Sequence, residues 1–211
     1  MEADFWHKRW EAGQIGFHQS KPNSFLVSHF KTLNLPRGAR IFLPLCGKTH
    51  DIGWLLSQGY HVIGVELSAL AVDQLFDDLG VTTEATDLGH LKLLSSESID
   101  IYVCDIIDLT QDTIGTVDAI YDRAALVALP LRMRADYAAH LAELTNAAPQ
   151  LLVTFEYDQS LISGPPFAIW EDEIRCLYDA CYTASCLTRG TVQGGMKGHP
   201  ATEAIWHLTP K

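Results

Sequence analysis

The chain has 211 residues, of which 47% are hydrophobic and 19% charged, as is typical of a folded globular protein rather than a disordered chain. Its formal net charge of −11 repels phosphate backbones and anionic lipids, which argues against nucleic acid as a substrate. No apolar run approaches the roughly 20 residues of a membrane span, and the acidic segment at positions 1–4 does not resemble a secretory signal. We therefore expect a cytoplasmic protein without a membrane partner.

The cysteine and histidine patterns bear on metal and disulfide sites. Five cysteines form an odd number and include no C-x-x-C pair, and the nine histidines show no H-E-x-x-H spacing. Zinc sites and disulfide frameworks have other spacings. We expect reduced thiols and no metal.

Two helices are predicted before the first strand. The first covers residues 4–10 and carries Trp6 and Trp10 one turn apart, so that both can project from one side. The second begins at Asn23 or Ser24, either of which can cap it, and its apolar positions extend to Leu33. The tryptophans either pack in the core or form a lid whose aromatic faces attract a cation.

A β–α–β–α unit follows. Residues 41–45 and 61–65 are short apolar runs, as expected of parallel strands buried on both faces, and Glu66 closes the second. A helix is predicted from about Thr49, and another after the cap Ser68.

The rest of the chain continues the alternation of strands and helices, which favours a doubly wound sheet in a single domain over residues 1–211. The last two β-like runs are close enough in sequence to pair as a hairpin, which would place an antiparallel strand in the sheet. The predicted strands cover residues 98–104, 117–121, 150–156, 181–189 and 201–208, and the helices about 131–144 and 170–178.

Ligands of open α/β sheets bind outside the carboxyl ends of the strands. The turn of residues 44–48 occupies this position, but Gly47 is its only glycine, whereas dinucleotide turns need several for close approach to a pyrophosphate. The turn therefore suits a ligand without a phosphate to bind. Glu66 lies about 20 residues later, where a carboxylate can accept bonds from ribose hydroxyls; the alternative is a solvated residue that caps the next helix.

Two further strand ends carry charged side chains. Asp105 could reach an adenine amino group, while Asp108 is predicted to open a following helix; both could also be ordinary turn residues. Arg123 could neutralise a carboxylate or stack over a planar acceptor, or it could form a salt bridge with Asp122 or another carboxylate.

Five segments, in order, resemble the thiopurine S-methyltransferase family, whose bacterial branch is the most similar. The resemblance extends over nearly the whole chain. The segments are Trp6-x-x-x-Trp10, Gly16-Phe17-His18-Gln19, Phe42-Leu43-Pro44-Leu45-Cys46-Gly47-Lys48, Gly64-Val65-Glu66-Leu67-Ser68 and Tyr121-Asp122-Arg123-Ala124-Ala125-Leu126-Val127-Ala128.

The resemblance implies an α/β fold of the class I methyltransferase type, Rossmann-like, with a doubly wound, seven-stranded, mostly parallel sheet and one antiparallel C-terminal strand. Residues 1–35 would form an N-terminal helical lid and residues 40–211 the core. S-adenosyl-L-methionine would be the methyl donor, and Phe17 would touch the acceptor. The implied cofactor contacts are Trp10, Leu45, Glu66, Arg123, Trp6, Gly47, Asp105 and Ile106.

The implied activity is methyl transfer to small aromatic or heterocyclic thiols, with selenium or tellurium compounds as further acceptors, in a monomeric detoxification enzyme. In-line displacement at a sulfonium methyl disperses charge, so it needs alignment and a water-poor pocket rather than a dedicated base. Arg123 would orient the acceptor or the cofactor. The basic residues near the family's C-terminal substrate loop do not align clearly with residues 191–201, so the natural acceptor stays open. The alternatives are a nicotinamide-dependent oxidoreductase and a non-catalytic cofactor-binding module.

Overall fold

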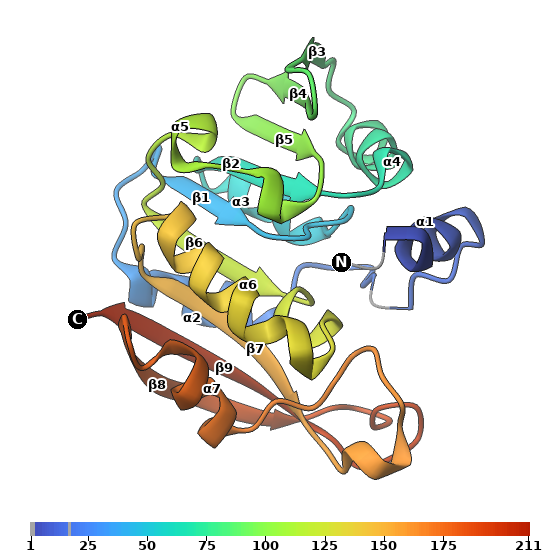
Figure 1. The fold of residues 1–211 in the computed structure, drawn as a ribbon, viewed down its shortest axis with the longest axis vertical. Helices are drawn as coiled ribbons and strands as arrows, with labels where there is room; N and C mark the ends of the chain where they lie inside the picture. The colour runs from blue at the N-terminus through green and yellow to red at the C-terminus, as the bar shows by residue number, and fades with distance from the viewer. Residues whose placement is uncertain (1–2, 17) are drawn as a thin grey trace. The chain divides into compact units, whose positions relative to one another are not determined.

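The computed structural model describes residues 3–16 and 18–211, which combine helices and strands throughout (Figure 1). The chain divides into two compact units, Met1–Asp118 and Ala119–Lys211. Among the described residues there are nine strands, two more than the seven that the family resemblance implies.

The first unit contains a sheet in the order β3-β4-β5-β2-β1. The three strands β1, β2 and β5 run parallel, and β4 and β3 extend the sheet with antiparallel pairing. Within the described part of this unit the strands are β1 (Arg40–Leu43), β2 (His61–Glu66), β3 (Glu84–Asp87), β4 (Lys92–Ser96) and β5 (Ile99–Val103), and the helical segments are α1 (Ala3–Glu11), α2 (Ser24–His29), η1 (Phe30–Leu33), α3 (His50–Ser57), α4 (Ala69–Leu79), η2 (Ile106–Asp108) and α5 (Gln111–Ile114).

Local sequence explains most boundaries of this unit. Ser68 accepts a hydrogen bond from the Ala71 amide and so caps α4, as predicted, and α4 ends at Gly80, whose φ of 66° suits a residue without Cβ. Asn23 caps α2 through the amides of Phe25 and Leu26. The helix predicted to reach Leu33 is α-helical only to His29 and then tightens into the 3-10 segment η1.

Two features of the first unit differ from the sequence prediction. The first strand ends at Leu43 rather than at residue 45, because Leu45 has a left-handed φ of 46° that cannot continue a strand. The hairpin of β3 and β4 was not predicted. All four residues of β3 are exposed, so this edge strand has no alternation of apolar and polar residues for a sequence pattern to detect.

The second unit, all of whose residues are described, contains strands in the order β6-β7-β9-β8. β6 and β7 are parallel, whereas β9 is antiparallel to both β7 and β8, so the predicted C-terminal hairpin and antiparallel strand are confirmed. Helices α6 and α7 lie over the same face of these strands in Figure 1. The elements are β6 (Ala119–Arg123), η3 (Leu126–Ala128), α6 (Leu131–Leu144), β7 (Gln150–Glu156), η4 (Gln159–Leu161), α7 (Glu171–Tyr178), β8 (Tyr182–Thr191) and β9 (Thr202–Pro210).

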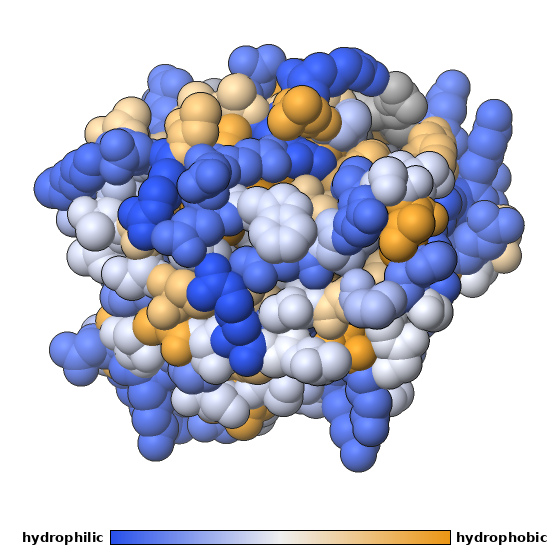
Figure 2. Space-filling model, turned by 90° about the horizontal axis from the view of Figure 1, so that it is seen from below, coloured by the Kyte–Doolittle hydropathy of each residue, from blue (hydrophilic) through white to orange (hydrophobic). Residues whose placement is uncertain are grey.

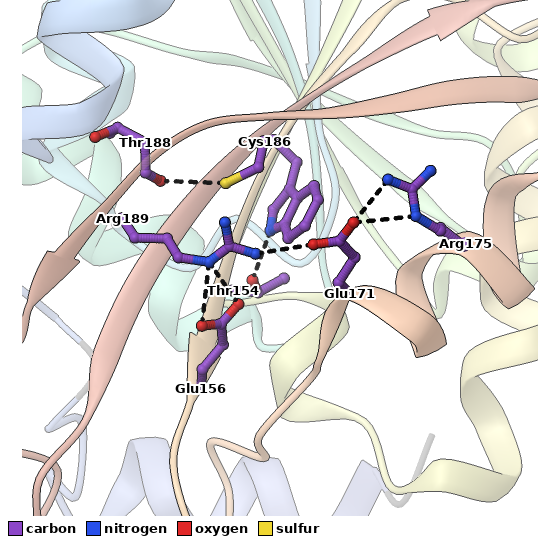
Figure 3. Close-up of polar contacts among 8 residues, drawn as sticks. Thr154, Glu156, Glu171, Arg175, Cys186, Thr188 and Arg189 are labelled. Carbon is purple, nitrogen blue, oxygen red and sulfur yellow. Dashed lines mark hydrogen bonds and ion pairs between the residues drawn. The ribbon is translucent and has the colours of Figure 1, made fainter.

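A chain of ion pairs links three elements of the second unit (Figure 3). Arg189 on β8 donates to Glu156 at the end of β7 (Nε to Oε1, 3.1 Å) and to Glu171 on α7 (Nη2 to Oε2, 3.2 Å). Glu171 also accepts from Arg175, and the Arg189 guanidinium lies 5.1 Å from the ring centroid of the buried Trp206. Two carboxylates thus already balance the charge of Arg189, which makes it a structural cation rather than an anion-binding residue.

The face shown in Figure 2 carries many hydrophilic side chains, with hydrophobic residues as small separate patches among them. In the part of the chain that the structure describes, no helix is both long enough and apolar enough to cross a bilayer.

Candidate functional site

Three of the segments selected from the sequence meet at one edge of the first unit's sheet. The turn of residues 44–48 follows β1, Glu66 ends β2, and residues 104–106 follow β5. These three strands are parallel neighbours, so their carboxyl ends lie side by side. This is the edge at which open α/β sheets bind ligands.

Two backbone amides hold the turn after β1 against the end of β2, and a third amide, from Ser68, fixes the Glu66 side chain from its own segment. The Cys46 amide donates to the Val65 carbonyl at 2.9 Å. The Gly47 amide donates to Glu66 Oε2 at 2.9 Å, and the Ser68 amide donates to Glu66 Oε1 at 2.8 Å. Both oxygens of the Glu66 carboxylate are therefore fixed in place, and each keeps a second lone pair for a ligand hydroxyl.

Glu66 is nearly buried, with 7% of its surface exposed. Burial raises the pKa of its carboxyl above the usual range, while hydrogen bonds from the amides of Ser68, Gly47 and Leu67 oppose this shift. An electrostatic contribution from His7 on α1 also lowers the pKa. The carboxylate thus lies in a dry site surrounded by donors, where hydrogen bonds to a ligand are stronger than in water.

The side chain of Cys46, in this turn, is buried and is not a nucleophile. Burial, and then the charge of Glu66, raise the pKa of its thiol well above the usual value, so the thiol stays neutral. A Cβ on Gly64 would come within 2.9 Å of Cys46 Sγ and 2.6 Å of Ile101 Cδ1. The absence of a side chain at Gly64 therefore provides the space that Cys46 occupies.

The turn after β5 differs in one respect from the prediction. The Cys104 amide donates to the Glu66 backbone carbonyl at 3.2 Å, which joins this turn to the end of β2. Asp105, rather than Asp108, caps the next helical segment, because its side chain accepts from the Ile107 amide, and Asp108 is the last residue of that segment. Ile106 is buried, with 4% exposure.

The tryptophans lie on α1, as predicted, and α1 contacts α4. Trp10 is buried at 5% exposure, whereas Trp6 is half-buried and meets Phe5 edge to face, with 5.2 Å between ring centroids. This helix also carries His7, whose electrostatic effect lowers the pKa of Glu66. Phe17, the predicted acceptor contact, lies outside the described residues.

Arg123 belongs to the second unit, where it ends β6 and is half-buried. The next residue, Ala124, has a left-handed φ of 63°. The preceding Asp122 is fully buried and accepts from the Leu126 amide (3.1 Å) and from the Tyr137 hydroxyl (2.7 Å). Asp122 thus forms hydrogen bonds with the turn and with α6, rather than the surface salt bridge with Arg123 that the sequence left open as one alternative.

Sequence reasoning missed two residues near the candidate positions. His7 lies between the two tryptophans, but a lone histidine on an amphipathic helix has no motif to mark it. Asp122 was considered only as a salt-bridge partner of Arg123, and its position directly after the predicted strand of residues 117–121 was the signal that could have indicated its burial. Across the described part of the chain, no group of three or more His, Cys, Asp or Glu residues is arranged to hold a metal ion.

Comparisons with known proteins agree on one family. The model of the family "Thiopurine S-methyltransferase (TPMT)" matches residues 1–204. A thiopurine S-methyltransferase of Xanthobacter autotrophicus is 54% identical over 210 residues, covering 99% of each chain. One from Teredinibacter turnerae is 51% identical over 210 residues, covering 99% of this chain and 98% of the relative.

Solved structures show the same fold at low sequence identity. The 1,6-didemethyltoxoflavin-N1-methyltransferase of Burkholderia thailandensis, with bound S-adenosylhomocysteine, has a TM-score of 0.65 and 17% identity, covering 98% of this chain and 87% of that chain. Magnesium protoporphyrin IX methyltransferase of Synechocystis, with bound S-adenosylmethionine, has a TM-score of 0.63 and 15% identity, covering 98% and 94%. The fold class predicted from the sequence is confirmed, apart from the number of strands.

Proposed function

Because the chain belongs to the thiopurine S-methyltransferase family and is an S-adenosylmethionine-dependent methyltransferase, we propose that Glu66 holds the ribose of the methyl donor and that the acceptors are small aromatic or heterocyclic thiols. The observation that carries the proposal is the doubly anchored Glu66 carboxylate at the shared edge of β1, β2 and β5. Selenium and tellurium compounds are further proposed acceptors, since they are soft nucleophiles of the same kind.

The residues at this edge fit S-adenosyl-L-methionine. Its ribose offers two hydroxyl donors, which match the two carboxylate oxygens of Glu66. It has no phosphate, which matches a turn with Gly47 as its single glycine. Bound there, the cofactor supplies an electrophilic methyl group on a sulfonium sulfur.

The remaining proposed roles are those that the family resemblance implies. Leu45 and Gly47 contribute backbone beside the ribose, and Asp105 and Ile106 border the adenine. Trp6 and Trp10 cover the cofactor and keep water out, and aromatic faces there also favour a cation. Arg123 binds the carboxylate end of the cofactor or orients the acceptor. Phe17 contacts the acceptor ring.

The protein needs to align the acceptor with the methyl group rather than to activate the acceptor chemically. An acceptor thiol or thione that ionises below neutrality is already nucleophilic, so the residues supply orientation and exclusion of water. Cys46, the thiol at the cofactor turn, is kept neutral by burial and so does not compete as a methyl acceptor. The family match and the glycine-poor turn leave the oxidoreductase alternative without support.

A methyl-transfer panel tests this proposal. The purified chain is incubated with methyl-labelled S-adenosylmethionine and aromatic thiols, selenium and tellurium species, or small phenols. We expect transfer to the thiols and selenium species and little to the phenols, which are harder nucleophiles and mostly protonated at neutral pH. Binding of S-adenosylhomocysteine without transfer to any acceptor would refute the substrate proposal and favour a non-catalytic binding module.

We also propose that the enzyme is a cytoplasmic monomer. The net charge of −11 and the hydrophilic face in Figure 2 support a protein that stays apart from its own copies. Light scattering after size exclusion should give the mass of one chain, 23.4 kDa. A mass of twice that value would refute the monomer.

A further inference from the structure

The buried carboxylate of Asp122 lies directly beside Arg123 in β6. Successive side chains of a strand point to opposite faces, so the two residues face different sides of the sheet. Asp122 is 0% exposed, and each of its oxygens accepts a hydrogen bond within the second unit. Oδ1 accepts from the Leu126 amide at 3.1 Å, and Oδ2 accepts from the Tyr137 hydroxyl on α6 at 2.7 Å.

These two bonds span the turn that follows Arg123. Ala124 in this turn has φ of 63°, a conformation that a residue with a Cβ adopts only when its surroundings enforce it. The turn then enters η3, where the Val127 carbonyl accepts from the Phe167 amide at 2.7 Å. Asp122 therefore joins both ends of a strained turn to α6, and Arg123 is the residue directly before that turn.

We infer that Asp122 is a positioning residue, whose ionised carboxylate bonds to Leu126 and Tyr137 and thereby holds the turn that presents Arg123 to the ligand. This inference rests on the proposed role of Arg123 in binding the cofactor or the acceptor. The ionised form matters because both partners are donors. A protonated carboxyl has to use one oxygen as a donor itself, and its remaining bonds lose the strength that charge confers.

The surroundings of Asp122 make this contact sensitive to pH. Burial raises the pKa of Asp122 to about 6, although the hydrogen bonds from Tyr137 and Leu126 act against this shift. The titratable groups facing Asp122 are Tyr137 on α6 and Tyr178 on α7, and burial raises the pKa of both well above the usual value, so neither ionises near neutrality. Leu152, its register partner on β7, is apolar. Asp122 is therefore the member of this group that changes charge between pH 5 and 7.

The first arm of the test follows the Leu126 amide by nuclear magnetic resonance between pH 5 and 8. In the wild-type chain its chemical shift should titrate with an apparent pKa of about 6, and this titration should vanish in Asp122→Asn. In Tyr137→Phe the midpoint should move to higher pH, because the lost hydrogen bond had lowered the Asp122 pKa. Tyr182→Phe is the matched control: it removes a tyrosine hydroxyl that donates to the Ala148 carbonyl, away from Asp122, so the midpoint should not move.

The second arm measures the affinity for S-adenosylhomocysteine and kcat/KM with an aromatic thiol over the same pH range. If only the ionised form of Asp122 presents Arg123 to the ligand, either the affinity or kcat/KM should fall at pH 5 to about one-tenth of its value at pH 8, because a group with a pKa of about 6 is only about one-tenth ionised at pH 5. The fall should shift to higher pH in Tyr137→Phe and not in Tyr182→Phe. A purely structural role would lower activity by the same factor at every pH.

Failure of the inference and failure of the proposed function give different results. Without cofactor binding or methyl transfer at pH 7.5 in the wild-type chain, the proposed function fails. With normal activity at pH 7.5, the inference is overturned if the Leu126 amide does not titrate, or if Tyr137→Phe and Tyr182→Phe have the same midpoint in both arms. The comparison of the two tyrosine variants remains decisive if Asp122→Asn does not fold.

Discussion

Replacing Glu66 with glutamine tests the proposed ribose contact, because it keeps the size of the side chain and removes its charge. Each carboxylate oxygen now accepts from a backbone amide, Gly47 on one side and Ser68 on the other. In the Glu66→Gln variant the NH₂ group must face one of these two donors. The nitrogen at that position loses the hydrogen bond from the backbone amide and can no longer accept a hydrogen bond from a ribose hydroxyl.

The expected loss follows from hydrogen bonds to a charged acceptor, which contribute about 1.5–3 kcal/mol each. Loss of one such bond to the ribose corresponds to an affinity for S-adenosylhomocysteine weaker by about 10- to 150-fold. Isothermal titration calorimetry at pH 7.5 measures the change, and circular dichroism checks that the variant is folded.

Glu97→Gln is the matched control for this prediction. It makes the same chemical change at an exposed residue just before β5, at the opposite end of the strand from the candidate site, so the affinity should stay unchanged. A folded Glu66→Gln variant that binds S-adenosylhomocysteine within twofold of the wild type would refute the ribose contact.

Three further predictions concern stability. Folding raises the pKa of Asp122 from 3.8 to about 6, so ionisation of this buried carboxyl costs the wild type up to about 3 kcal/mol of folding stability once the pH exceeds 6. The Asp122→Asn variant does not have this cost and should gain stability relative to the wild type as the pH rises from 4 to 7. Denaturant unfolding at pH 4.5 and 7.5 measures the difference in stability between the two proteins, and the same difference at both pH values would contradict this prediction. Gly64→Ala should destabilise the chain by about 1–3 kcal/mol, because the new Cβ would overlap with Ile101 and Cys46. Gly53→Ala is the control and should be neutral or stabilising, because its Cβ would lie 3.5 Å from Leu79, an ordinary contact distance. Similar melting temperatures for the two variants would contradict this packing. Arg189→Met should destabilise the protein by about 1 kcal/mol, because it leaves the nearly buried Glu156 without its cation, while the 40% exposure of Arg189 limits the loss. Lys211→Met, at a more exposed ion pair, is the control and should have a smaller effect. An equal effect of the two substitutions would count against the chain of ion pairs.

Elements with a clear apolar period were predictable from the sequence. Residues 131–144 and 150–156 match α6 and β7 to the residue, because one has a buried helical face and the other is buried along nearly its whole length. The hairpin of β3 and β4 was missed because its stability comes from backbone pairing at a sheet edge, and exposed side chains leave little trace of this in the pattern.

The candidate site was predictable in its positions but not in its hydrogen bonds. The strand end at Glu66 could be located from an apolar run, whereas the strand predicted over residues 117–121 extends in the structure to Arg123, at the end of β6 (Ala119–Arg123). The left-handed turns at Leu45 and Ala124 could not be located, because neither residue type indicates a positive φ. The bond from Asp122 to Tyr137 joins a strand to a helix through tertiary packing, for which a single sequence has no local signal.

The most direct measurement of the central claim is a crystal structure of the chain with bound S-adenosylhomocysteine. We expect the ligand to lie at the carboxyl ends of β1, β2 and β5, with both ribose hydroxyls within hydrogen-bond distance, about 2.5–3.0 Å, of the Glu66 carboxylate oxygens. A ligand bound elsewhere, or ribose hydroxyls more than about 3.5 Å from Glu66, would contradict it.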